Sequence, residues 1–137
     1  DSLDQNVRVV VKAHPTCTRK QLIKLASEFS DQRLEYTDKD IPELLESAYV
    51  MISAASSVCV EAVAVGIPVA LYGSRSGITM NPIPLSVPSN IWSIFYSEDQ
   101  LEYFLKEALN KNDRISIVNK LYAPINKENT MELFECV

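Results

Sequence analysis

His14 is the first residue of this chain whose type and position could do chemistry, and it is the only histidine. It follows the apolar run of residues 9–11, and Pro15 ends the predicted strand, because proline cannot donate a hydrogen bond within a sheet. An imidazole at a strand end can hydrogen-bond a phosphate or protonate a leaving oxygen near neutral pH. The alternative, which the isolated His-Pro pair favours, is a histidine that caps a turn or a helix.

Small residues connect a second apolar run, residues 50–52, to a helix predicted over residues 56–65. They are Ser53, Ala54, Ala55, Ser56 and Ser57. Small side chains let a ligand approach the backbone, and the free N–H groups and dipole of a helix start favour an anion. Ser56 also has the residue type of a helix N-cap. The two roles are compatible, because a capping serine hydroxyl can also donate to a phosphate.

Two carboxylates are candidates for contacting a ribose or a base. Glu61 lies among apolar residues of the predicted helix 56–65, where a carboxylate is unfavourable unless it has a partner or faces a cleft. It could accept hydrogen bonds from both ribose hydroxyls, or it could simply reach solvent on the exposed stripe of the helix. Asp38 follows a predicted strand and could meet a ribose or a base, although a charged run of this kind is more often a solvated turn.

Arg75 lies between Gly73 and Gly77 at the start of a segment, residues 73–88, that is rich in glycine, serine and proline. The composition predicts a long surface loop. The arginine could grip a ligand as part of a lid, but an ordinary mobile loop is the favoured interpretation.

The elements that must position these residues alternate between strand and helix. The pattern predicts strands over residues 7–13, 33–37, 49–53, 68–72 and 91–96, and helices over 18–29, from 40, over 56–65 and over 97–109. Nearly continuous apolar strands separated by helices indicate an α/β fold, with a Rossmann-like parallel sheet and helices on both faces. In such sheets ligands bind at the carboxyl ends of the strands, which is where the candidate residues lie.

Bulk properties limit the possible functions. The chain of 137 residues predicts a Rossmann-like domain over 1–110 and a helical tail over 111–137. Its net charge of −5 argues against nucleic-acid binding. The chain has one histidine and three cysteines without a CxxC pair (Cys17, Cys59 and Cys136), and this composition predicts no metal site. No apolar run is long enough to cross a membrane, and the acidic start is unlike that of a signal peptide. The absence of an initial methionine predicts a piece of a longer protein, whose other parts could carry localisation signals.

A resemblance to a known family rests on two segments, VKAHPT and DIPELLESAYVMISAASSVCVEAVAVGIPVALY. Together they resemble the carboxyl-terminal domain of GT-B glycosyltransferases, and most of all the bacterial surface-polysaccharide enzymes of the sialyltransferase and CDP-glycerol-polymer transferase groups. The resemblance spans residues 7–72, about half of the chain. It implies that His14 and Pro15 match a His-Pro motif, and Ser56 and Ser57 a Ser-Ser motif, that contact the phosphates of a cytidine-nucleotide donor. Glu61 matches an acidic residue that holds the donor ribose in many GT-B enzymes.

The function that this resemblance implies is donor binding within a glycosyltransferase of surface-carbohydrate biosynthesis, with a CMP-, CDP- or UDP-linked sugar as ligand. The amides of Ser56 and Ser57 and the catalytic candidate His14 would stabilise the leaving nucleotide phosphate. The family keeps its general base in an amino-terminal domain, and the Asp-Gly or Glu-Gly pair used there by the sialyltransferases does not occur here. We therefore expect no activity from this chain alone, and we expect it to need no cofactor and no metal. The intact enzyme is expected in the cytoplasm, where it could work at the inner face of the membrane.

Two alternatives remain open. A GT-B-fold sugar-nucleotide 2-epimerase also places His-Pro and a small-residue loop around a nucleotide, but it normally has glycines where this chain has Ala54 and Ala55. A non-catalytic partner-binding module could keep the same Rossmann-like fold. GT-B carboxyl-terminal domains usually have a further strand-helix unit before the His-Pro strand. Only six residues precede that strand here, so the predicted sheet could lack its first strand.

Overall fold

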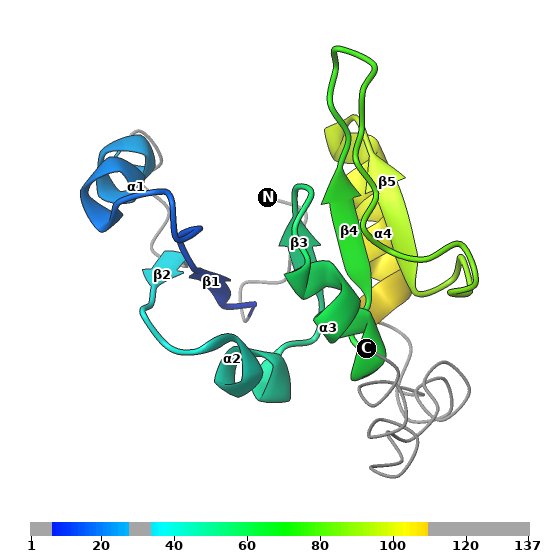
Figure 1. The fold of residues 1–137 in the computed structure, drawn as a ribbon, viewed down its shortest axis with the longest axis horizontal. Coiled ribbons are helices and arrows are strands. Elements are labelled where there is room, and N and C mark those ends of the chain that lie inside the picture. Colours follow the sequence, from blue (N-terminus) through cyan, green and yellow to red (C-terminus); the bar gives the residue numbers. More distant parts are fainter. Residues whose placement is uncertain (1–6, 28–33, 110–137) are drawn as a thin grey trace, which may run out of the picture. The chain divides into compact units, whose positions relative to one another are not determined.

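The computed structural model describes residues 7–27 and 34–109, which divide between two compact units, Asp1–Glu46 and Ser47–Val137 (Figure 1). In chain order the elements are β1 (Val9–Val11), α1 (Arg19–Ala26), β2 (Leu34–Tyr36), α2 (Ile41–Ser47), β3 (Met51–Ser53), α3 (Val58–Ala64), β4 (Val69–Tyr72), β5 (Trp92–Phe95) and α4 (Glu98–Leu109). The class is α/β, and every strand pair is parallel.

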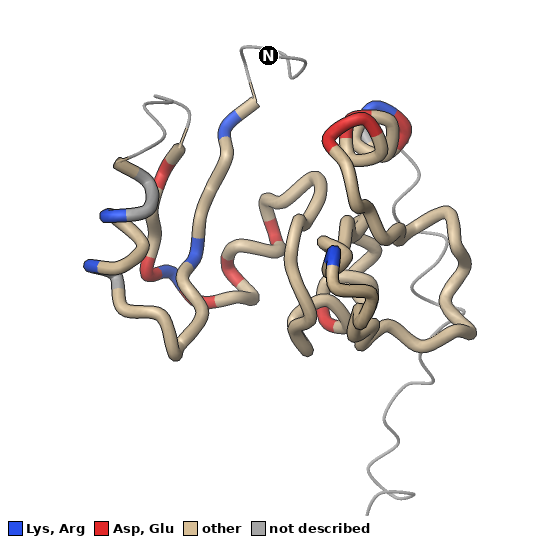
Figure 2. The backbone as a smooth tube through the Cα atoms, turned by 90° about the horizontal axis from the view of Figure 1, so that it is seen from above, with Lys and Arg blue, Asp and Glu red and all other residues tan. Residues whose placement is uncertain are grey.

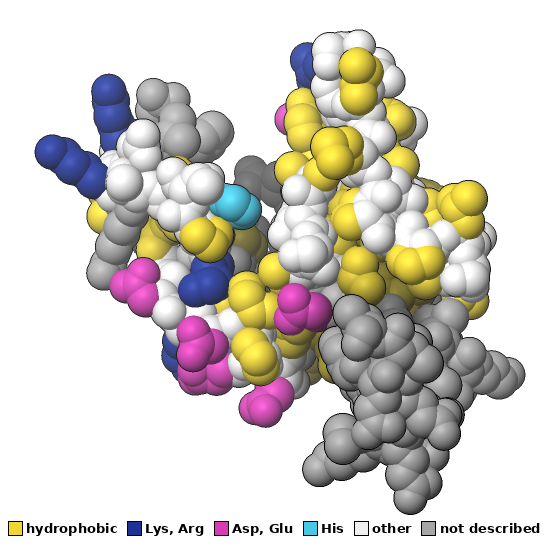
Figure 3. Space-filling view, viewed as in Figure 1, with side chains coloured by type: hydrophobic (Ala, Val, Ile, Leu, Met, Phe, Trp, Pro, Cys, Tyr) yellow, Lys and Arg dark blue, Asp and Glu magenta, His cyan; other side chains and the backbone are white. Residues whose placement is uncertain are grey.

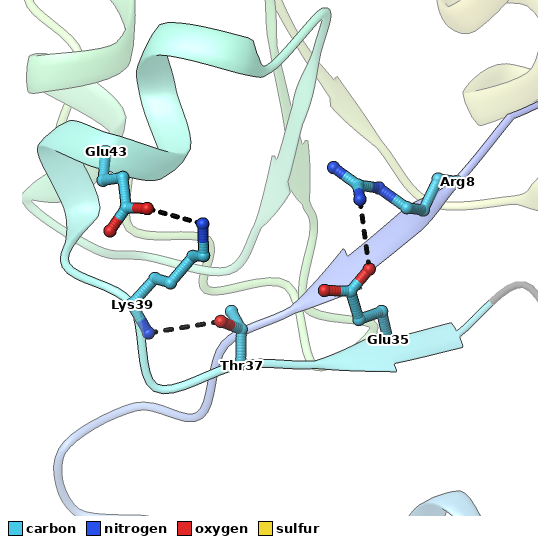
Figure 4. A network of polar contacts seen from close by, with 5 residues as sticks. All are labelled: Arg8, Glu35, Thr37, Lys39 and Glu43. Carbon is cyan, nitrogen blue, oxygen red and sulfur yellow. Dashed lines mark hydrogen bonds and ion pairs between the residues drawn. The ribbon is translucent and has the colours of Figure 1, made fainter.

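The first unit pairs β1 with β2 in parallel, with Val10 opposite Glu35. Helix α1 connects the two strands and begins with a capping box. In this box the Thr18 N–H donates to the Gln21 side chain at 2.9 Å, and the Gln21 N–H donates back to the Thr18 hydroxyl at 3.3 Å. On the surface of the strand pair, Arg8 and Glu35 form an ion pair at 3.3 Å (Figure 4).

Helix α2 begins after Asp40, whose carbonyl oxygen accepts a hydrogen bond from the Leu44 N–H at 3.1 Å. This start agrees with the prediction of a helix from residue 40. The turn before it is held by the Lys39 N–H, which donates to the Thr37 hydroxyl at 3.2 Å, and by an ion pair between the Lys39 and Glu43 side chains (Figure 4). Both charged side chains are exposed, so the ion pair contributes little to stability.

The second unit contains a parallel sheet in the order β3-β4-β5. Ser53 lies opposite Leu71, and Leu71 opposite Ile94. Figure 1 shows α3 on the near side of this sheet and α4 on the far side, so helices lie on both faces of it. The strand β4 is central, and Val69, Ala70 and Leu71 are buried within it. These residues form the apolar run expected of a strand covered on both faces.

Helix α3 ends in a Schellman motif. Gly66 adopts a left-handed backbone with φ 80°, and its N–H donates to the Val63 carbonyl at 3.0 Å. The Ile67 N–H donates to the Ala62 carbonyl at 2.9 Å. This geometry explains why the chain has glycine at the predicted end of the helix, and it aims the chain into β4 after two further residues.

Among the described residues, the buried apolar core lies entirely in the second unit. Its largest fully buried side chains are those of Leu71, Val63, Val69 and Cys59. The segment predicted as a surface loop also contributes, because Ile83 and Val87 keep only 3% and 5% of their surface exposed. The Val87 carbonyl accepts a hydrogen bond from the Trp92 indole at 3.2 Å. The prediction of a wholly superficial loop was therefore wrong for its second half.

The α/β class, the parallel pairing and all nine predicted elements are confirmed, with shorter bounds at most ends. Helix α3 begins at Val58 rather than at the predicted Ser56, because the chain first makes a tight turn through Ser56 and Ser57. The expected sheet is present as two smaller sheets, one in each unit. The predicted tail, residues 111–137, lies outside the described residues, and so does Cys136. The single domain over 1–110 stays a prediction.

Candidate functional site

His14 lies three residues beyond β1, in a turn that it helps to form. Its carbonyl oxygen accepts a hydrogen bond from the Cys17 N–H at 2.8 Å. The ring nitrogen Nδ1 accepts the Thr16 N–H at 3.3 Å and lies 2.7 Å from the Thr16 hydroxyl. The turn-capping role, stated above as the alternative, is therefore present in the structure.

This capping role leaves the other ring nitrogen of His14 available. An amide N–H can only donate, so Nδ1 is the acceptor, and the neutral ring carries its proton on Nε2. The side chain is exposed, as the cyan surface in Figure 3 shows, and Nε2 makes no hydrogen bond within the part of the chain that is described. The turn thus holds an imidazole with an outward N–H donor, so the structural and ligand-binding roles of His14 are compatible.

The turn between β3 and α3 contains the predicted small residues. The Cys59 N–H donates to the Ser56 carbonyl at 3.1 Å, and the Val60 N–H donates to the Ser57 carbonyl at 2.9 Å. Ser57 is the N-cap residue, but its side chain makes no capping hydrogen bond. The Ser56 backbone N–H hydrogen-bonds the Cys59 thiol. The N–H groups of Ser57 and Val58 and the hydroxyls of Ser56 and Ser57 have no hydrogen-bond partner within residues 7–27 and 34–109. The turn therefore concentrates four donors that the described fold does not use, two N–H groups and two hydroxyls.

The buried Cys59 and the half-buried Ser53 lie at the base of this turn. The Cys59 thiol is fully buried, and its Sγ donates to the Ala54 carbonyl at 3.7 Å. Burial raises the pKa of the Cys59 thiol, while hydrogen bonding to Ser53 opposes part of the rise. The thiol therefore stays protonated and packs as a small apolar group. Sequence analysis did not assign Cys59 a place beneath the turn.

The two candidate carboxylates are both exposed. Glu61 lies in the first turn of α3 and reaches the surface, as its alternative interpretation predicted. Asp38 lies between β2 and α2, and its backbone carbonyl is 3.5 Å from the Lys12 ammonium. His14 and Asp38 belong to the first unit, whereas Ser53, Ser56, Ser57 and Glu61 belong to the second. The ligand roles of all six stay predictions.

The second unit has very few charges near the β3–α3 turn. Between Ser47 and Ser97 the only charged residues are Glu61 and Arg75. Figure 2 shows this as tan backbone through most of that stretch. Within residues 47–97, an anion bound at the β3–α3 turn would therefore meet neutral N–H and O–H donors rather than a cluster of cations.

Gly73 and Tyr96 form a feature of the same sheet end that sequence analysis missed. Each is the first residue beyond its strand, and the Gly73 N–H donates to the Phe95 carbonyl at 2.8 Å. The Tyr96 ring lies over Gly73 so closely that a Cβ on that glycine would collide with it. Aligning the last residues of the two predicted strands would have placed both residues at this edge, but it would not have revealed the ring contact.

Comparison of the chain with protein-family models, curated proteins and solved structures found no match. None of the helices within the described ranges is both long and apolar enough to cross a membrane. In the same ranges, no three histidine, cysteine, aspartate or glutamate side chains are grouped as metal ligands would be.

Proposed function

We propose that this chain is the nucleotide-sugar donor-binding domain of a glycosyltransferase in surface-carbohydrate biosynthesis. The resemblance of its His-Pro and Ser-Ser segments to GT-B enzymes motivates the proposal. The observation that carries it is that two strand ends present hydrogen-bond donors that the described fold leaves unused. These are the Nε2–H of His14 after β1 and, after β3, the Ser57 amide and the hydroxyls of Ser56 and Ser57.

The chemistry of these groups suits the diphosphate or monophosphate of a nucleotide. A departing nucleotide accumulates negative charge on its phosphate, and fixed N–H and O–H donors lower the energy of that charge. Small side chains at Ala54 and Ala55 allow the phosphate to approach the backbone. In this proposal Glu61 contacts the ribose and Asp38 contacts the ribose or the base.

The remaining parts of the reaction are assigned to the rest of the enzyme. The acceptor and the general base would come from an amino-terminal domain of the same enzyme, so the proposal assigns binding rather than turnover to this chain. The donor is a CMP-, CDP- or UDP-linked sugar, and the proposed location is the cytoplasm, where the intact enzyme could work at the inner face of the membrane.

Calorimetric titration of the chain with CMP, CDP and UDP tests this proposal. We expect saturable binding of at least one of them, and a loss of affinity of about tenfold or more when Ser56→Ala and Ser57→Ala are combined, because hydrogen bonds to a charged phosphate are strong. Ser74→Ala combined with Ser76→Ala is the matched control, since these exposed hydroxyls bond each other at 2.6 Å in the β4–β5 loop. If none of the nucleotides binds, the proposal fails and a partner-binding module is favoured.

A further inference from the structure

Tyr96 is an aromatic side chain with a half-exposed ring at the carboxyl end of the second unit's sheet. It immediately follows β5 and keeps 47% of its surface exposed. Its backbone is fixed, because the Tyr96 N–H donates to the Gln100 side chain at 2.7 Å. The Ser97 hydroxyl next to it lies 3.4 Å from the Gln100 N–H and caps α4. The ring is thus anchored by the start of a helix rather than carried on a free loop.

The ring lies on the same face of the sheet as the side chain of Ser53. Strand pairing places Ser53 beside Leu71 and Leu71 beside Ile94. Side chains alternate along a strand, so positions 73 and 96, two residues further on, belong to this same face. The contact between Gly73 and Tyr96 agrees with this placement, since a side chain built on Gly73 would enter the Tyr96 ring.

Gly73 is needed here for space rather than for backbone conformation. Among the described glycines, only Gly66 and Gly77 have a positive φ. Without a side chain at position 73, the ring of Tyr96 rests across the end of β4, the strand next to β3. Neighbouring strands are about 4.8 Å apart, so β3 and β5 end about 10 Å from each other. That spacing matches the reach from the phosphate of a nucleotide to its base.

We propose that Tyr96 is a stacking platform for the pyrimidine base of a nucleotide whose phosphate lies at the β3–α3 turn. The ring lies against Gly73, and about half of the residue's surface stays exposed, which leaves area for contact with a flat ring of similar size. Base–aromatic stacking needs no charged partner, which suits a surface with only Glu61 and Arg75 between residues 47 and 97. This inference rests on the proposed function and adds to it the residue that would recognise the base.

The test compares two ligands that differ only in the base, CMP and ribose 5-phosphate, on the full chain. Tyr96→Ala should weaken CMP binding about tenfold, the effect of one lost base–aromatic stack, and leave ribose 5-phosphate binding unchanged. Tyr96→Phe should keep the CMP affinity. Tyr103→Ala, which removes an exposed tyrosine of α4, is the matched control and should also keep it.

A second measurement does not depend on the folding of a variant. In the wild-type chain, the ring protons of Tyr96 should shift upfield in NMR spectra when CMP binds and should not shift with ribose 5-phosphate. Unchanged CMP affinity in Tyr96→Ala, equal losses for the two ligands, or unmoved Tyr96 ring signals would each overturn the inference while nucleotide binding itself stood. If the wild-type chain binds neither ligand, the proposed function fails first, and this inference fails with it.

Discussion

The ring of Tyr96 occupies the space that a side chain at position 73 would need. The two residues sit side by side because each follows its strand directly, and β4 and β5 run parallel in register, with Tyr72 opposite Phe95. The rings of Tyr72 and Phe95 meet edge to face, with centroids 5.6 Å apart. The end of this strand pair is therefore closely packed even though it lies at the protein surface.

Gly73→Ala should destabilise the chain through this contact alone. Overpacking of this kind typically costs about 1–3 kcal/mol, and here the exposed ring can move aside, so we expect the lower end of that range. In a Tyr96→Ala background the same substitution should cost almost nothing, because the colliding ring is gone. Urea unfolding of the two single variants and the double variant measures this coupling. An equal cost of Gly73→Ala in both backgrounds would show that the glycine is needed for another reason.

Ser57 and Ser97 have the same position relative to their helices but different roles. The Ser97 hydroxyl lies 3.4 Å from the Gln100 N–H, whereas the Ser57 side chain makes no capping bond. Ser97→Ala should therefore lower the free energy of unfolding by about 1 kcal/mol, while Ser57→Ala should leave it unchanged. Thermal or urea unfolding of both variants gives the comparison. A clear loss of stability in Ser57→Ala would mean that its hydroxyl serves the fold and is not held ready for a ligand.

His14→Ala separates the two roles of the imidazole. The fold loses only two exposed local hydrogen bonds, those of the Thr16 N–H and hydroxyl with Nδ1, so its stability should fall by about 1 kcal/mol. In the intact enzyme of the proposed function, loss of an oxyanion-type donor should slow sugar transfer by roughly a hundredfold or more. The melting temperature and the transfer rate of one purified variant distinguish the turn-capping role of His14 from its ligand-binding role. A variant that unfolds readily yet turns over normally would remove His14 from the donor site.

Cys59 should resist alkylation and should make stability fall at high pH. Burial raises the pKa of its thiol above the ordinary value of 9.0, so the folded state favours the protonated form. The resulting stabilisation is fully present below the unfolded-state pKa, and it is lost as pH rises through the higher folded-state pKa. Mass spectrometry after iodoacetamide should show rapid labelling of the less buried Cys17 and slow labelling of Cys59.

The control for this prediction is Cys59→Ala, which removes the titrating group. Urea unfolding should show a smaller loss of stability above pH 9 in that variant than in the wild-type chain. Labelling of Cys59 as fast as that of Cys17, or the same pH dependence with and without the thiol, would contradict the burial that the structure describes.

The elements of the fold could be predicted from the sequence because each has a local signal. Apolar runs mark β1 and β4, Gly66 marks the end of α3, and Ser97 precedes α4. The distribution of strands between two sheets could not be predicted, because strand pairing depends on contacts between distant residues. The buried Ile83 and Val87 were missed for a related reason, since loop composition says nothing about where an apolar side chain packs.

The candidate site was predicted less completely than the fold. The residue types of His14, Ser56 and Ser57 could be recognised beforehand, but only the structure reveals that His14 Nδ1 is already used by Thr16 and that the Ser57 hydroxyl does not cap α3. The contact of Tyr96 with Gly73 has no signal in either residue alone, because it arises from the register of two strands.

Backbone NMR spectra of the chain during titration with CMP, CDP and UDP test the central claim, donor binding, most directly. We predict saturable shifts of the Ser57 and Val58 amides, whose N–H groups have no partner in the described fold, and of the His14 ring nitrogen Nε2. Residues on the exposed side of α4, such as Tyr103, should not move. If millimolar concentrations of all three nucleotides leave the β3–α3 turn and His14 unshifted, the chain is not a nucleotide-sugar donor-binding domain.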